Sequence, residues 1–165
     1  MDHHHTSPPM NSQKRILAID PGNTHSAAVV ISAGQIHSKM YLPNDAFLSW
    51  LVPEALAADI VCVEMVASMG MAVGATIFET CVFIGRIMQL CPTAQRITRV
   101  QVKTSICHSA RAKDANVRQA LIDFWGPQGS KKAPGPTYGI SGDMWAALAV
   151  GTALLGEHKL YQTPT

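Results

Sequence analysis

The sequence predicts an α/β domain with a mixed five-stranded sheet and helices on both faces. Apolar runs of strand length alternate with longer segments of helical periodicity, which is typical of this fold class. A tight turn at Ala33-Gly34 separates two early strands and indicates a hairpin. With 165 residues, 47% hydrophobic and 15% charged, the chain can bury the core of one such domain and is not typical of a disordered protein.

The first predicted strand, residues 15–20, is an almost continuous apolar run that ends in Asp20. Such a run is typical of a strand that is buried on both faces. Pro21 and Gly22 then predict a turn. By their alternation and the breaks between them, the other four strands are predicted at residues 26–32, 35–41, 60–64 and 97–102.

Four helices are predicted between and after these strands, at residues 44–57, 76–90, 114–125 and 142–155. Asn44 is a suitable N-cap for the first of them. The apolar stripe of helix 76–90 is too wide for a surface helix of a monomer. We therefore expect this helix either to be central to the core or to pack against a second subunit.

The ends of the chain differ in composition from its middle. We interpret residues 1–13 as a flexible leader, 14–157 as the folded domain and 158–165 as a C-terminal tail. No apolar stretch reaches the roughly 18–20 residues needed to cross a bilayer, and the leader lacks a secretory signal's apolar segment. The four cysteines show no C-x-x-C spacing and are expected to be reduced thiols. These features predict a cytoplasmic protein without a membrane partner.

Three carboxylates stand at the ends of apolar elements. Asp20 and Glu64 end the first and fourth strands, and Asp143 opens the last helix. Acids are scarce, 11 in 165 residues, so their recurrence at such positions needs a reason. Carboxylates brought together at one sheet edge repel each other unless a cation joins them, and hard oxygen ligands suit Mg²⁺ or Mn²⁺.

Positive charge is concentrated in one part of the chain. The formal net charge is only +2, yet residues 96–132 contain eight Lys or Arg and only two acids. An acidic metal site beside a basic segment is what an enzyme acting on a polyanion such as DNA needs. The alternative is that these basic residues only solvate a helix face.

The ordered set of motifs resembles the RuvC family of Holliday-junction resolvases, within the ribonuclease H-like superfamily. The resemblance runs from about residue 15 to 155, and stretches 70–74 and 78–86 look closest to phage-encoded members. The residues that carry it are Ile19-Asp20-Pro21-Gly22, Val63-Glu64, Val102-Lys103, Lys113, and Asp143 leading into Ala147-Leu148-Ala149-Val150.

The resemblance implies a ribonuclease H-like fold in which the first and fourth strands are parallel neighbours. It implies a metal-dependent crossover junction endodeoxyribonuclease that cuts four-way and other branched DNA, in DNA recombination, repair or phage DNA debranching. One or two Mg²⁺ ions per subunit, or Mn²⁺ in their place, would be held by Asp20, Glu64 and Asp143. It also implies a homodimer.

Other residues receive roles through the same resemblance. Lys113 is expected to be catalytic beside the scissile phosphate, with Lys103 nearby. Met69 is expected near a wedge that unstacks junction bases. The residues expected to contact DNA are therefore Met69, Lys103, Arg111, Lys113, Arg118, Lys131 and Lys132. The chain departs from the family at Ala146, where a fourth carboxylate is usual.

Two other functions fit parts of the sequence. Asp20-Pro21-Gly22-Asn23-Thr24 matches the D-x-G-x-T phosphate loop of actin-like and sugar-kinase ATPases. Those enzymes normally pair two such domains, and 165 residues supply one. An inactive branched-DNA-binding protein is the third possibility, because Ala146 removes an acid.

Overall fold

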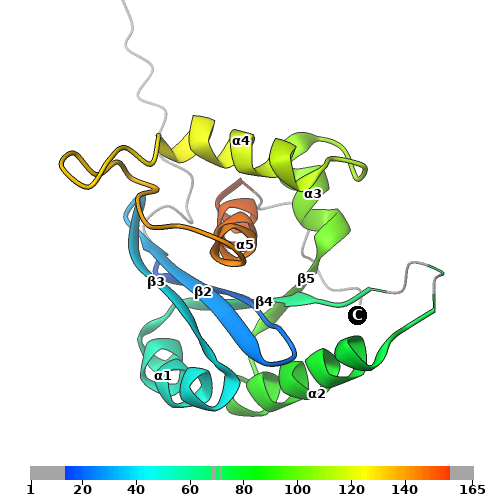
Figure 1. Ribbon diagram of the computed structural model, residues 1–165. Helices are drawn as coiled ribbons and strands as arrows, with labels where there is room; N and C mark the ends of the chain where they lie inside the picture. Colours follow the sequence, from blue (N-terminus) through cyan, green and yellow to red (C-terminus); the bar gives the residue numbers. More distant parts are fainter. Residues whose placement is uncertain (1–13, 68–69, 71, 157–165) are drawn as a thin grey trace, which may run out of the picture.

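A single five-stranded mixed sheet, in the order β3-β2-β1-β4-β5, is the centre of the computed structural model (Figure 1). The model describes residues 14–67, 70 and 72–156, so the predicted leader and tail lie outside the described residues. The strands are β1 (Ile16–Asp20), β2 (His25–Ser32), β3 (Gln35–Pro43), β4 (Ile60–Met65) and β5 (Gln95–Thr98). The helices are α1 (Asn44–Ala57), α2 (Ala75–Leu90), α3 (Arg99–Cys107), α4 (Asp114–Trp125) and α5 (Met144–Gly156).

The pairing of β1 decides where the first two carboxylates lie. β1 is antiparallel to β2 and parallel to β4, and β4 is parallel to β5. In the β1–β4 register Ile19 is the partner of Val63, so the next residues along the two strands are Asp20 and Glu64. The predicted parallel neighbourhood of the first and fourth strands is confirmed, and both acids reach the same sheet edge.

Helices cover both faces of the sheet, as predicted (Figure 1). Leu17 and Ile19 of β1 pack in a core with α1 and α2, whereas Ile16 and Ala18 pack on the opposite side with α5. Successive strand residues point to opposite faces. Because both faces are covered, every residue of β1 before Asp20 must be apolar, which accounts for the continuous apolar run.

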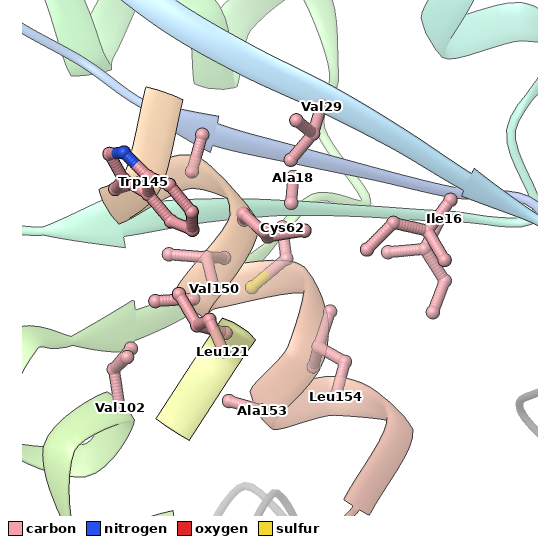
Figure 2. Packing of buried hydrophobic residues seen from close by; sticks show 14 of the residues in the cluster. Ile16, Ala18, Val29, Cys62, Val102, Leu121, Trp145, Val150, Ala153 and Leu154 are labelled. Carbon is pink, nitrogen blue, oxygen red and sulfur yellow. The ribbon is translucent and has the colours of Figure 1, made fainter. Parts of the chain in front are cut away.

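Helix α5 lies directly on the sheet and is buried almost along its whole length. Figure 2 shows Ala18 and Cys62 of two strands facing Val150 and Ala153 of this helix. A Cβ atom on Gly151 would lie 3.2 Å from the Ala18 Cβ, so a glycine permits this close approach. The tight packing fixes the N-terminal end of α5, where Asp143 lies.

The predicted strand at residues 97–102 is wrong in its last four residues, 99–102, which belong to a helix. Strand β5 ends at Thr98, and α3 begins at Arg99. Thr98 caps α3: its hydroxyl accepts a hydrogen bond from the Gln101 backbone N–H, and the Gln101 side chain accepts one from the Thr98 N–H at 2.8 Å. This Thr-x-x-Gln capping box starts a helix where the apolar alternation indicated more strand.

The cysteines behave as expected from their spacing. All four are free, and Cys62 and Cys91 are buried. Burial is the main cause that raises the pKa of the Cys62 thiol to about 12, so this thiol stays protonated in the core. Among the helices in the described part of the chain, none is long and apolar enough to span a bilayer.

Replacing Thr98 with Ala should lower the free energy of unfolding by about 1 kcal/mol, because the first turn of α3 loses its capping oxygen. Thr98→Ser retains that oxygen and serves as the matched control, with a stability close to wild type. Urea denaturation followed by circular dichroism measures both. An equal loss in the two variants would show that the cap is not the cause.

Candidate active site

Asp20 and Glu64 lie at the carboxyl ends of neighbouring parallel strands and line one cavity of about 400 Å³. Arg99 and Lys103 of α3 line the same cavity. The Glu64 side chain is only 13% exposed, and that of Lys103 is 20% exposed. The sheet edge therefore holds two acids and two bases in a partly closed space.

The electrostatics of Asp20 show that the predicted acids influence one another. Its pKa is raised from about 3.8 to about 8, first because the carboxyl is buried, then because Glu64 and Asp143 add negative charge. Arg99 acts in the opposite direction. All three acids predicted from the sequence thus contribute to one electrostatic site.

Asp143 approaches this site from the end of α5. Its backbone carbonyl accepts hydrogen bonds from the N–H groups of Ala146 and Ala147, so it is the residue from which the helix starts. It lines a second cavity, of about 410 Å³, that is also bordered by Arg99. Ala146 lines this cavity too, so the position of the missing fourth acid borders the same space with only a methyl group.

Arg99 and Asp114 were not predicted as site residues from the sequence, yet Arg99 contacts both Glu64 and Asp114. Arg99 Nη1 lies 3.5 Å from Glu64 Oε2, and Nη2 donates to Asp114 Oδ1 at 2.8 Å. The hydrogen bond from Arg99 is the first cause that lowers the pKa of Asp114. Burial is the first cause that raises the pKa of Glu64, and Arg99 opposes it. The Thr98-x-x-Gln101 spacing is a local signal for the start of α3, but it competes with the apolar alternation of residues 97–102.

The donor set fits a hard divalent cation in its chemistry. Asp20 is partly buried and repelled by two other carboxylates, and a cation between them would relieve this repulsion. In the described residues, however, no three His, Cys, Asp or Glu side chains form a group that could hold a metal ion as they stand. The site thus has the oxygen ligand types that suit a hard divalent cation, although the described side chains do not enclose one as they stand.

The predicted basic residues lie in three different places. Lys103 lines the Asp20 cavity, and its Nζ is 3.4 Å from Asp114 Oδ1. Arg118 lies outside that cavity, with Cζ 4.8 Å above the Trp145 ring. The remaining described ones are exposed and lie before α4 or in the loop that precedes α5: Arg111, Lys113, Lys131 and Lys132. Met69 lies outside the described residues.

Lys113, which was expected to be catalytic, is not among the residues that line the cavity of Asp20 and Glu64. It is exposed, precedes α4, and its backbone N–H donates to Asn116 Oδ1 at 3.0 Å. Lys103, which was expected only to be nearby, is the lysine that borders the cavity of Asp20 and Glu64.

Comparison with known proteins identifies the fold. No protein-family model and no curated protein matches the sequence. Two solved structures of Thermus thermophilus RuvC are similar to the chain, each with a TM-score of 0.56 and 16% identity. The first covers 84% of this chain and 92% of the RuvC chain. The second, RuvC in complex with a Holliday junction substrate, covers 86% and 92%. The chain therefore has a RuvC-like, ribonuclease H-like fold, as predicted.

Replacing Asp20 with Asn should stabilise the protein at alkaline pH in EDTA. Between about pH 4 and 8 the folded protein keeps a proton on Asp20 that the unfolded chain has released, so its stability falls as pH rises through this window. Asn carries no charge and escapes this loss. At about pH 9 we expect a gain of at least about 1.4 kcal/mol, the equivalent of one pKa unit.

Urea denaturation of both proteins at about pH 4, 7 and 9 measures this difference. The gain should grow with pH and be small near pH 4, where the unfolded chain has only begun to release the proton that the folded protein keeps. A difference that is the same at all three pH values would contradict the raised pKa.

Proposed function

We propose that the protein is a metal-dependent endodeoxyribonuclease that cuts branched DNA, four-way junctions above all. The observation that carries the proposal is the position of Asp20 and Glu64 at one edge of a RuvC-like sheet, with Asp143 close enough for its charge to raise the pKa of Asp20. One of the similar RuvC structures is described as a complex with a Holliday junction substrate. Such an enzyme would act in DNA recombination or repair, or in debranching phage DNA.

The three acids would hold one or two Mg²⁺ ions, for which Mn²⁺ would substitute. When bound, such ions activate water for attack on a phosphodiester and stabilise the developing charge. Asp20 and Glu64 would each provide a carboxylate ligand from the paired strands β1 and β4. Asp143, which lines the neighbouring cavity, would provide a third.

Lys103 is the residue best placed to act on the scissile phosphate. It lines the cavity of Asp20 and Glu64, and Asp114 holds its ammonium at 3.4 Å. In this position it would orient a phosphate oxygen and offset negative charge. Lys113, exposed at the start of α4, would contact the backbone further along the strand.

The exposed bases would bind the DNA backbone outside the cavity. Arg111 and Lys113 precede α4, and Arg118 lies on this helix. Lys131 and Lys132 lie in the loop that follows it. Contacts of this type position the DNA without reading its sequence, and they weaken as salt rises. The proposal therefore includes strongly salt-dependent binding of branched DNA.

A second subunit would pack on α2. The helix turns Phe83, Ile84 and Ile87 into the core, but Phe78 and Val82 on its other side are 62% and 68% exposed. The first alternative from the sequence, a helix central to the core, holds for one side of α2, and the exposed side is where we propose the second, a subunit contact. An apolar strip of this kind would form the contact of a homodimer, which could address two strands of a junction.

Asp20→Asn and Glu64→Gln should each lower the cleavage rate of a mobile four-way junction by more than about 100-fold. The reason is that metal ions contribute several kcal/mol to such reactions, and about 1.4 kcal/mol equals a tenfold rate. Gel assays with the junction, a flap and plain duplex, each with and without Mg²⁺, measure the rate and the substrate preference.

The control for these variants is Asp123→Asn, which removes an exposed acid of α4 and should cleave like wild type. Junction binding by the Asp20 and Glu64 variants should persist. Full activity in EDTA would contradict the proposal, and so would stabilisation by ATP without any cleavage.

A binder of branched DNA that never cuts is the second candidate. Ala146 beside Asp143 and the absence of a ready-made metal-holding group among the described residues favour it. In that case the wild-type protein would bind junctions equally well with and without Mg²⁺ and leave them intact.

Val82→Glu should convert a homodimer into a monomer, because it places a charge in the centre of the apolar strip of α2. Light scattering at micromolar concentration should then give a mass near 17.7 kDa in place of twice that value. Leu56→Glu on α1, at a side chain that is 84% exposed, is the matched control and should remain dimeric. A monomeric wild type would contradict the proposed contact.

A further inference from the structure

Arg99 lies between the two cavities that the candidate acids line. It borders the cavity of Asp20 and Glu64 and also that of Asp143 and Asp114. Its side chain is 35% exposed, so it is partly accessible to solvent. Arg99 is the first residue of α3, whose first turn is capped by Thr98.

The two carboxylates that contact Arg99 hold it unequally. The contact with Asp114 is a short hydrogen bond of 2.8 Å, whereas that with Glu64 is 3.5 Å long. Asp114 is 74% exposed and Glu64 is 13% exposed. The long contact is therefore with Glu64, which is poorly solvated, and the short contact is with Asp114, which is already well solvated.

We propose that Arg99 is a built-in counter-ion of Glu64 that competes with the divalent cation, and that Asp114 retains the guanidinium when the cation takes Glu64. This inference rests on the proposed metal site and adds a residue that sets its affinity. Arg99 is a positioning residue in this scheme, since it acts through Glu64.

The charge arrangement gives the physical reason for the competition. A buried carboxylate needs a positive partner, and both Arg99 and a divalent ion would supply one. They cannot both use the same oxygen without bringing two cations together. Asp114 makes the exchange possible, because the arginine keeps a charge-assisted hydrogen bond after it leaves Glu64. Lys103, also paired with Asp114, adds a second positive charge that disfavours a cation nearby.

Mn²⁺ binding to the full chain without DNA tests this proposal independently of cleavage. Calorimetric titration should show that Arg99→Gln binds Mn²⁺ about five- to tenfold more tightly than wild type, a coupling of ordinary size. Arg99→Lys keeps the charge and should bind close to wild type. Arg96→Gln, which removes an exposed arginine of β5 three residues earlier, is the matched control and should leave the affinity unchanged.

Thermal unfolding supplies the second measurement. In EDTA, Arg99→Gln should melt below wild type, since Glu64 has lost its partner, and saturating Mn²⁺ should raise the melting temperature more in this variant than in wild type. A purely structural role would weaken Mn²⁺ binding, so the sign of the change separates the two explanations.

The outcomes also separate this inference from the proposed function. If the wild type cleaves junctions with Mg²⁺ but Arg99→Gln binds Mn²⁺ no more tightly than wild type, the counter-ion role is wrong and the nuclease stands. If neither protein binds Mn²⁺ at millimolar concentration, both proposals fail. Tighter binding by Arg99→Gln, with Arg99→Lys near wild type, supports the competition.

Discussion

The parallel pairing of β1 with β4 is the constraint on which the site depends. It ends two buried strands at one level, so Asp20 and Glu64 must share an edge where little water reaches them. Carboxylates in such a position are costly as anions, and the raised pKa of Asp20 expresses that cost. A protein keeps this arrangement only where the charge is used or compensated, and this edge contains both the proposed ligands and the compensating bases.

The negative charge of Glu64 is compensated by residues of helices α3 and α4. Arg99 and Lys103 lie on α3, and Asp114 at the start of α4 pairs with both. Arg99 contacts both the exposed Asp114 and the largely buried Glu64, and Lys103 contacts Asp114 at the border of the Glu64 cavity. These contacts lower the energetic cost of the charged Glu64 side chain in the absence of a metal ion. They also place a positive charge that would compete with a metal ion for Glu64.

The similarity to RuvC at 16% identity rests on packing more than on individual residues. The sheet needs apolar residues on both faces of β1 and small ones where α5 lies against it, such as Ala18 and Gly151. Many sequences satisfy these demands. The proposed function would depend on far fewer positions, and Ala146 stands at the one where the resemblance implies a fourth carboxylate.

The sequence by itself predicted most of the strands, the helices on both faces of the sheet and three acids at the ends of apolar elements, because hydrophobic periodicity and strand-end positions are local properties of the chain. It could not determine that Thr98 starts a helix against the apolar pattern, since a capping box competes with strand propensity and only the packed structure decides between them. Nor could it place Arg99 between Glu64 and Asp114, which are 35 and 15 residues away along the chain. Contacts of that separation, and the choice of Lys103 over Lys113 at the cavity, follow from how α3 crosses the edge of the sheet, which only tertiary packing fixes.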